Sequence, residues 1–275
     1  MSIDVIDVWM QHPTQRFLQQ PFFASLWRWT GVNAASGVPD IPLEATLAGM
    51  DHAGISTGLI AAWHGPQGDL ISNDEVADIV SQHPGRFAGL ASVDLNQPMQ
   101  AVRELRRRVR EQGFKGLRIV PWLWNLPPND RRYYPLYAEC CELQVPFCTQ
   151  IGHTGPLMPS EPGRPIPYLE QVALDFPELK IVAGHVGAPW TSEAILLARK
   201  FENVWLDTSA YKASRYPTEL VAYMQSSACS RVMFGSNYPM LTAAACLKDL
   251  TSLGLSADAE AAFLHGNARA VFKLQ

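Results

Sequence analysis

The sequence predicts an α/β fold, a single (β/α)8 TIM barrel spanning residues 1–275. Two observations support this prediction. The length of 275 residues is close to the roughly 250 residues typical of such barrels, and short apolar runs alternate with amphipathic stretches along the whole chain. An open doubly wound sheet is the rival fold. No GxGxxG or GxxxxGKS/T motif follows any apolar run, which disfavours the nucleotide-binding forms of that rival.

Eight apolar runs are the expected strands, because strands buried on both faces lack a clean polar alternation. They cover residues 3–8, 57–62, 87–93, 116–120, 146–151, 180–183, 204–207 and 232–235. The expected helices follow them at 43–53, 73–82, 99–112, 133–143, 168–175, 192–200, 217–226 and 243–253. Ser72 and Glu75 form a capping-box pattern, and Gly54 and Gly113 are expected to end helices. Right-handed crossovers between eight such pairs predict a parallel barrel.

Composition and charge narrow the classes of partner. Hydrophobic residues make up 47% of the chain and charged residues 17%, which predicts a water-soluble domain with a large core. The formal net charge of −4 gives no broad basic surface, so nucleic acid is not an expected partner. The sequence contains no run of about 18 apolar residues, so we expect no membrane-spanning helix.

The N-terminus and the cysteines predict a cytoplasmic protein. The opening MSIDVIDVW has no basic segment, so we expect no secretory signal. The five cysteines form no CxxC pair, and reduced thiols are the simplest expectation. The sequence leaves the oligomeric state open, with a homodimer among the expected assemblies.

Catalytic groups of TIM barrels lie at the C-terminal ends of the strands and in the loops that follow. Polar and aromatic residues gather at these positions: Trp9, Gln11, His12, Trp63, His64, Asp94, Arg118, Trp122, Trp124, Gln150, His153, His185, Trp190, Asp207, Ser209, Tyr211, Asn237 and Tyr238. Five tryptophans at one rim predict a pocket for a flat, apolar or aromatic ligand, although ordinary core packing is the alternative. The Pro/Gly-rich segment 155–167 is expected to be a loop that faces this site.

Individual residues differ in how strongly their position predicts function. His185 ends the sixth strand and is expected to face the barrel mouth, and His153 lies in a GHTGP loop. His12 and His64 precede or flank turns, so a structural role is an equal alternative for them. Arg118 lies inside the fold, where an unpaired guanidinium is costly, so it should pair with a carboxylate or an anionic substrate.

Seven segments resemble the amidohydrolase superfamily in their order and spacing. They are IDVWMQ at 6–11, GLRIVPW at 116–122, VPFCTQIGHTG at 145–155, IVAGHVG at 181–187, VWLDTSAY at 204–211, FGSNYPM at 234–240 and FLHGNARAVFKL at 263–274. The resemblance covers nearly the whole chain. It is to the branch that contains aminocarboxymuconate semialdehyde decarboxylase, resorcylate-type decarboxylases and pyrone dicarboxylate lactonase. It implies a TIM-barrel enzyme that catalyses decarboxylation or lactone hydrolysis.

The resemblance also implies a metal site, and this chain departs from it. The family's first strand ends in D-x-H-x-H, and here the same frame reads Asp7, Trp9 and Gln11. Gln150 stands where the fifth strand usually supplies histidine, and Asn237 where the eighth supplies aspartate. Tryptophan has no lone pair to offer a metal, and amides are weak ligands. We therefore expect no metal and no other cofactor.

The leading hypothesis is a metal-independent hydrolase or lyase acting on a carboxylated, cyclic or aromatic small molecule that is anionic. His185, the family histidine that is retained, is the expected general acid/base. Gln150 and Asn237 would donate hydrogen bonds to a developing oxyanion. Catalytic roles are expected for His185, His153, Asp207 and Asn237. Substrate contacts are expected for Arg118, which would hold the carboxylate, and for Gln150, Gln11, Trp9, His12, His64, Trp63, Trp122 and Tyr211.

Two other classes stay open. One is a metal-dependent hydrolase whose ligands have moved to His12, His153 and His185. The other is a non-catalytic barrel that binds a small molecule. Metal analysis would separate the first from the rest, and a cluster of His185, His153 and Arg118 around one pocket would favour an enzyme over a binding protein.

Overall fold

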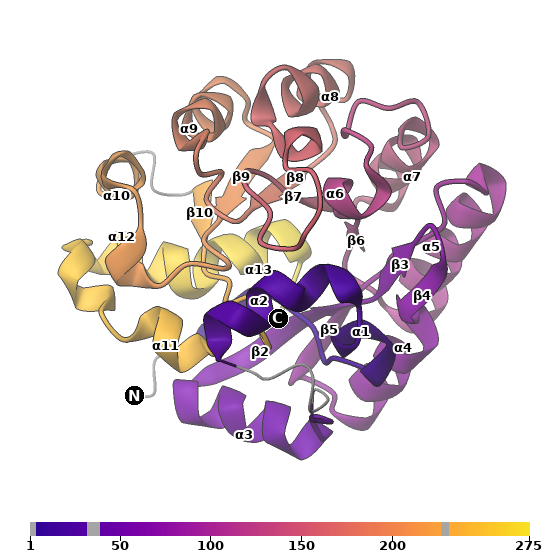
Figure 1. Ribbon diagram of the computed structural model, residues 1–275. Coiled ribbons are helices and arrows are strands. Elements are labelled where there is room, and N and C mark those ends of the chain that lie inside the picture. The colour runs from indigo at the N-terminus through magenta and orange to yellow at the C-terminus, as the bar shows by residue number, and fades with distance from the viewer. Residues whose placement is uncertain (1–3, 32–38, 227–230) are drawn as a thin grey trace.

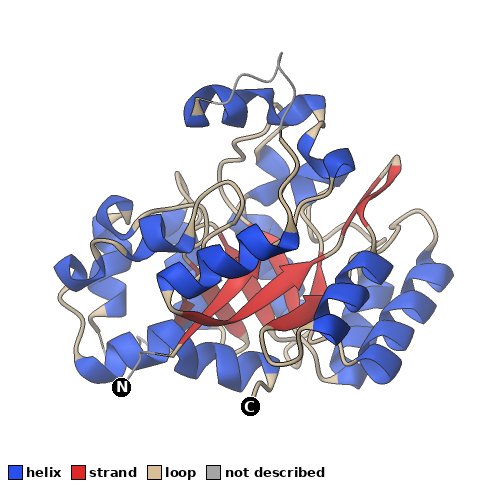
Figure 2. Ribbon diagram, turned by 90° about the horizontal axis from the view of Figure 1, so that it is seen from below, coloured by secondary structure: helices blue, strands red, loops and turns tan. Residues whose placement is uncertain are grey.

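Eight parallel strands surrounded by helices form the centre of the computed structural model (Figures 1 and 2). It describes residues 4–31, 39–226 and 231–275. The barrel strands are β1 Val5–Met10, β2 Ile55–Ala61, β5 Phe87–Leu90, β6 Leu117–Arg118, β7 Phe147–Gln150, β8 Ile181–Gly184, β9 Val204–Asp207 and β10 Val232–Met233. These strands match the expected runs to within a few residues. Ile3, the expected start of the first strand, and Cys229 lie outside the described residues.

The strands close into a barrel through two short junctions. One sheet has the order β1-β2-β5, and the other has the order β10-β9-β8-β7-β6. The Val8 amide donates to the Phe234 carbonyl at 3.0 Å and joins β1 to β10. The Arg118 amide donates to the Ala91 carbonyl at 2.7 Å and joins β6 to the end of β5. The predicted TIM barrel is therefore confirmed, and the open sheet is excluded.

The helices form a ring outside the strands (Figure 1). Those that follow barrel strands are α3 Leu43–Ala53, α4 Asn73–Gln82, α5 Pro98–Gln112, α7 Tyr134–Leu143, α8 Glu170–Asp175, α9 Thr191–Lys200, α10 Thr218–Met224 and α11 Ala243–Leu247. Ser72 and Glu75 form both bonds of the predicted capping box, and Gly54 and Gly113 adopt left-handed conformations that end α3 and α5. No helix within the described ranges is long and apolar enough to cross a membrane.

Several elements were not predicted. They are α1 Gln15–Leu18, α2 Ala24–Thr30, the hairpin of β3 Trp63–Gly65 and β4 Gly68–Ile71, α6 Pro121–Trp124, α12 Ala257–Ala261 and α13 Asn267–Phe272. We call residues 15–31 the N-terminal insertion, and its helix α2 (indigo) lies across the centre of the ring in Figure 1. Ser25 Oγ donates to the Gly155 carbonyl at 2.5 Å, and the Leu157 amide donates to the Phe22 carbonyl at 2.7 Å. The insertion therefore packs on the start of the expected loop 155–167, which also contains a 3₁₀ turn at Glu161–Gly163.

Candidate active site

A cavity of about 250 Å³ opens at the C-terminal end of the barrel. Four polar residues that line it end or follow barrel strands: Gln11 after β1, Gln150 in β7, His185 after β8 and Asn237 after β10. Parallel strands of a barrel end on the same side, and this brings the four side chains together. Its apolar and aromatic lining residues are Phe17, Phe23, Leu26, Trp29, Trp63, Trp122, Tyr211, Met240 and Leu241. The others are Thr30, His153, Gly155, Pro156 and Ala210. Among the described residues that line the cavity there is no Lys, Arg, Asp or Glu.

The structure places the expected site residues in two groups. Eight line the cavity: Gln11, Trp63, Trp122, Gln150, His153, His185, Tyr211 and Asn237. Five do not line it: Trp9, His12, His64, Arg118 and Asp207. An aromatic pocket thus exists, but of the five tryptophans expected around it only Trp63 and Trp122 line it, whereas Trp9, Trp124 and Trp190 do not.

A hydrogen-bonded chain behind the cavity orients the His185 ring. His185 Nδ1 lies 2.7 Å from Ser209 Oγ, and the Ser209 hydroxyl donates to Asp207 Oδ1. The Ser209 amide also donates to Asp207 Oδ1, at 2.9 Å. A serine hydroxyl has one proton, so Ser209 Oγ must accept from Nδ1–H of the neutral imidazole. This tautomer leaves the lone pair on Nε2 of His185, which is the nitrogen that is free for a ligand.

The buried position of this chain sets its charge state. Burial, reinforced by the nearby Arg118 guanidinium, lowers the pKa of His185 to about 3. Burial raises the pKa of Asp207, while hydrogen bonds from Ser209 oppose that rise. Burial also raises the pKa of Tyr211, so its hydroxyl remains a neutral donor. At neutral pH the histidine is therefore an uncharged proton acceptor.

Three residues that line the cavity adopt left-handed backbone conformations. The φ angles are 75° at His185, 68° at Ala210 and 67° at Asn237. Asn and His tolerate this region better than most residues, whereas alanine does not. Such conformations cost about 1–3 kcal/mol each and persist where the surrounding structure enforces them, often at functional sites. Their concentration around one cavity supports a functional role for this end of the barrel.

Trp9 fills the centre of the barrel behind the cavity together with Arg118. The Arg118 guanidinium carbon lies 4.1 Å from the centre of the indole, and the His185 ring meets the same indole edge-on at 5.0 Å. Arg118 Nη1 and Nη2 donate to the carbonyls of Met10 and Val8 at 3.2 and 2.8 Å. The expectation that Arg118 holds a substrate carboxylate is therefore wrong, because its guanidinium bonds to β1 and is separated from the cavity.

The centre of the barrel does not fit the divalent metal that the fold family implies. A Cβ placed on Gly184 would lie 2.7 Å from both Trp9 Cζ3 and Asp207 Oδ2, so the indole and the carboxylate crowd one point. The guanidinium stacked on that indole is a cation, and it would repel a second one. The side chains that reach the cavity from β1, β7 and the loop after β10 are neutral amides, which are weak ligands.

Relocated ligands do not form an alternative metal site either. Within the described ranges, no three His, Cys, Asp or Glu side chains are grouped so that they could hold a metal ion. His153 lies beside Ser160, with 3.2 Å between Nδ1 and Oγ. The set of His12, His153 and His185 is therefore not assembled in this structure.

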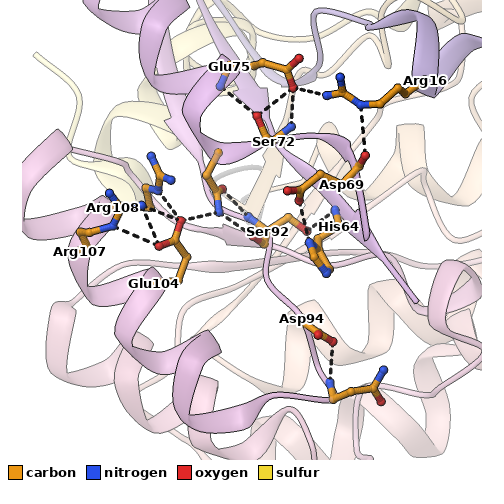
Figure 3. A network of polar contacts seen from close by, with 12 residues as sticks. Arg16, His64, Asp69, Ser72, Glu75, Ser92, Asp94, Glu104, Arg107 and Arg108 are labelled. Carbon is orange, nitrogen blue, oxygen red and sulfur yellow. Dashed lines mark hydrogen bonds and ion pairs between the residues drawn. The ribbon is translucent and has the colours of Figure 1, made fainter. Parts of the chain in front are cut away.

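His12 and His64 both face away from the cavity. His12 Nδ1 lies 2.9 Å from Thr46 Oγ1 of α3. His64 Nδ1 lies 2.7 Å from Asp69 Oδ1, and its ring stacks on Trp124 with centroids 6.1 Å apart. His64 instead borders a second hollow of about 400 Å³ among β4, α4 and α5, which carries a network of ion pairs (Figure 3). The expected contacts of both histidines with a ligand in the cavity are therefore corrected.

Sequence reasoning missed three parts of the site. The N-terminal insertion supplies Phe17, Phe23, Leu26, Trp29 and Thr30, and the loop after β10 supplies Met240 and Leu241. Ser209 was noted as a strand-end residue but was given no role. The density of aromatic residues between 17 and 29 was the available signal, because it is unusual for a connecting segment.

Comparison with known proteins identifies the family. A family model described as amidohydrolase matches residues 30–274. A gamma-resorcylate decarboxylase of Rhodococcus jostii is 29% identical over 219 residues, which are 61% of this chain and 65% of that protein. The chain thus aligns with less than two thirds of that curated relative's length.

Two solved structures share the fold. An uncharacterised TIM-barrel protein from Bordetella bronchiseptica superposes with a TM-score of 0.83 at 23% identity, covering 98% of both chains. A dihydroxybenzoic acid decarboxylase from Polaromonas, with bound manganese and 2-nitroresorcinol, has a TM-score of 0.71 at 21% identity and covers 98% of this chain and 97% of that one. Because the family model spans most of the sequence, this chain belongs to the amidohydrolase family.

Proposed function

We propose that the protein is a metal-independent carboxy-lyase that decarboxylates a small aromatic or cyclic carboxylic acid. One observation carries the proposal: an aromatic, uncharged cavity in which the neutral imidazole of His185 is held by Ser209 and Asp207. The related gamma-resorcylate decarboxylase supports the reaction class. The indole and guanidinium at the centre of the barrel support the absence of metal.

The cavity suits decarboxylation because it stabilises carbon dioxide better than a carboxylate. A carboxylate buried among apolar groups without a cation is raised in free energy, whereas carbon dioxide is uncharged. The reaction needs one proton. A proton forms a new bond to the ring carbon that carries the carboxylate, the C–C bond then breaks with its electron pair returning to the ring, and carbon dioxide leaves. His185 Nε2 carries a lone pair in the unoccupied site, so the proton must be taken up from solvent together with the substrate. We expect Nε2 to accept that proton and pass it to the ring carbon.

Neutral groups would orient the substrate ring. Trp122 Nε1 donates to Gln150 Oε1 at 2.6 Å, so the Gln150 amide is fixed in one orientation. Gln11 Nε2 donates to Asn237 Oδ1 at 3.4 Å, which leaves Asn237 Nδ2 as the donor for a ligand. In decarboxylation these amides would hold the substrate ring in place, and in lactone hydrolysis they would stabilise the developing oxyanion through fixed dipoles.

Lactone hydrolysis is the second candidate, and one observation favours it. The lone pair on His185 Nε2 is suited to accept a proton from an attacking water, and a cyclic ester would enter the cavity without charge. Incubation with a panel of hydroxybenzoic acids and aryl lactones, followed for carbon dioxide release and ring opening, tests both. Binding of panel members without turnover of any would indicate the non-catalytic barrel instead.

Purified protein is expected to contain much less than one equivalent of manganese, zinc or iron, and its turnover should survive chelators. The reason is that Trp9 and Arg118 occupy the centre of the barrel and the strand ends carry amides. Elemental analysis and activity after dialysis against EDTA provide the measurement. A stoichiometric metal whose removal abolishes turnover would refute metal independence.

The Asn237→Asp variant is expected to bind carboxylated ligands about tenfold or more weakly. Aspartate accepts the left-handed backbone of this position as asparagine does, so the fold should be retained. The new carboxylate would meet no cation among the lining residues and would repel an anion. KM for the acid should rise while the affinity for a neutral ring analogue stays near that of the wild type. Tighter binding of the acid by Asn237→Asp, with uptake of a metal, would contradict this account.

A further inference from the structure

We infer that the cavity binds uncharged rings, and that it admits an aromatic carboxylate only together with one proton, which is the proton that decarboxylation consumes. Only the last clause rests on the proposed function. The ligand class is therefore a neutral arene or a neutral carboxylate–proton pair, and not the free anion.

The first argument is the absence of charge in the lining. None of the described residues that line the cavity carries a formal charge at neutral pH when its histidines are neutral. The three segments outside the described ranges, 1–3, 32–38 and 227–230, contain no Lys, Arg, Asp or Glu in their sequence. Charge compensation for a bound anion is therefore not available from the described residues at the cavity surface when the two histidines are neutral.

The buried Arg118 guanidinium does not line the cavity, and it already bonds to the backbone. Arg118 donates to two carbonyls of β1 through Nη1 and Nη2, its buried Nε has no hydrogen-bond partner, and its guanidinium stacks on the Trp9 indole, which the His185 ring meets edge-on. Two buried carboxyl groups, Asp7 and Asp207, interact electrostatically with the same guanidinium. The guanidinium lowers the pKa of His185, but it also interacts with these two acids and does not line the cavity, so it offers no direct ion pair to a ligand.

Two further titratable groups, Cys148 and Tyr211, are neutral as well. Burial raises the pKa of the Cys148 thiol to about 12, and it also raises the pKa of the Tyr211 hydroxyl. His153 lines the same cavity and, unlike these groups, is exposed to solvent. No described residue that lines the cavity therefore offers a fixed positive charge to pair with a carboxylate, and the Arg118 guanidinium, which lowers the pKa of His185, does not line it.

Physical chemistry decides what such a cavity does with an acid. An isolated carboxylate in an apolar site is so unfavourable that the group binds a proton instead. The proton can reside on the ligand's carboxyl group or on His185 Nε2, and in both cases the occupied cavity is neutral overall. The stoichiometry of decarboxylation is one carboxylate and one proton converted into one arene C–H and one carbon dioxide. The one proton taken up when the carboxylate binds is therefore the one proton that forms the new arene C–H bond.

Titration calorimetry with benzamide, phenol and benzoate tests the inference. Each ligand is titrated in two buffers of different ionisation enthalpy at pH 6, 7 and 8. Benzamide and phenol should bind without proton uptake and with affinities that do not depend on pH. Benzoate should bind more weakly and take up close to one proton, so that its Kd rises about tenfold for each unit of pH. Benzoate binding with no proton uptake, or failure of all three rings to bind, would overturn the inference.

A cation placed in the cavity should remove the proton requirement. Leu241→Lys adds an ammonium to the lining, and Leu241→Met is the matched control without charge. In Leu241→Lys, benzoate should bind at least tenfold tighter at pH 8 with little proton uptake, whereas Leu241→Met should behave like the wild type. Met240→Lys offers the same test at the neighbouring lining position should the first variant not fold. Unchanged proton uptake in a folded lysine variant would count against the inference.

The two proposals fail in different ways. Benzoate binding without proton uptake would refute the inference and leave decarboxylation standing. Proton-coupled binding, combined with no turnover of any hydroxybenzoic acid, would refute the proposed function and leave the inference standing. Tighter benzoate binding only after addition of manganese would refute metal independence and, with it, the inference that a proton is the compensating cation.

Discussion

Replacement of His185 by asparagine is expected to lower turnover by about 10²–10⁴, the usual contribution of a positioned proton-transfer group. Among the described residues that line the cavity, the His185 imidazole is the only group held by a buried carboxylate through a hydroxyl, those of Asp207 and Ser209. Asparagine accepts the left-handed backbone of this position, where φ is 75°. Its amide can also donate to Ser209 Oγ. The melting temperature should therefore remain close to that of the wild type, while the proton carrier is lost.

Steady-state kinetics and thermal unfolding of His185→Asn provide the measurement, and His64→Asn is the matched control. His64 pairs with Asp69 away from the cavity, so its replacement should leave turnover unchanged. If His185 only braces the barrel rim, its loss would instead cost about 1–3 kcal/mol of stability through an unsatisfied partner, with little change in turnover. Full activity in His185→Asn would therefore end the proposed mechanism.

The barrel could be predicted because its signals are local. Buried strands and amphipathic helices differ in periodicity, and capping residues such as Ser72 mark helix boundaries directly in the sequence. The N-terminal insertion lacked such signals. Its helices span four and seven residues, and aromatic residues such as Phe17, Phe23 and Trp27 are buried without a helical stripe. Tertiary packing across the barrel mouth determines this segment, and a local pattern does not reveal it.

The site could be predicted by position along the chain but not by side-chain direction. Neighbouring residues of a strand point to opposite faces, so only one of Trp63 and His64 on β3 can reach the cavity. A different ambiguity concerns Trp9 and Gln11, which are two positions apart and would share one face of a regular strand. Trp9 lies within β1 and packs in the barrel, whereas Gln11 follows the end of the strand and reaches the cavity. The role of Ser209 depends on a contact with His185, 24 residues away in the sequence. Only the closed barrel brings these two residues together.

Replacement of Arg118 by alanine is expected to lower the free energy of unfolding by about 3–5 kcal/mol, the typical cost of removing one partner from a buried charge cluster. Arg118 is fully buried against Trp9, and its loss leaves the carbonyls of Val8 and Met10 without their donors. It also leaves the buried carboxyl of Asp7, whose pKa burial already raises to about 6, without a nearby cation. Because this role is structural, Arg118→Ala should be much less stable than the wild type, while KM in the folded fraction should be unchanged.

Urea unfolding of Arg118→Ala and of Arg16→Ala provides the comparison. Arg16 forms an exposed ion pair with Glu75, whose loss should cost no more than about 1 kcal/mol. The pH dependence gives a second, signed readout. The folded state holds the proton of Asp7 more tightly than the unfolded state, so stability falls as pH rises from about 4 to above 6. Without the guanidinium the pKa of Asp7 should rise further, so in Arg118→Ala this fall should extend to higher pH and become larger overall, while in Arg16→Ala it stays as in the wild type. A small stability change together with a large rise in KM for an acid would instead place Arg118 in ligand binding.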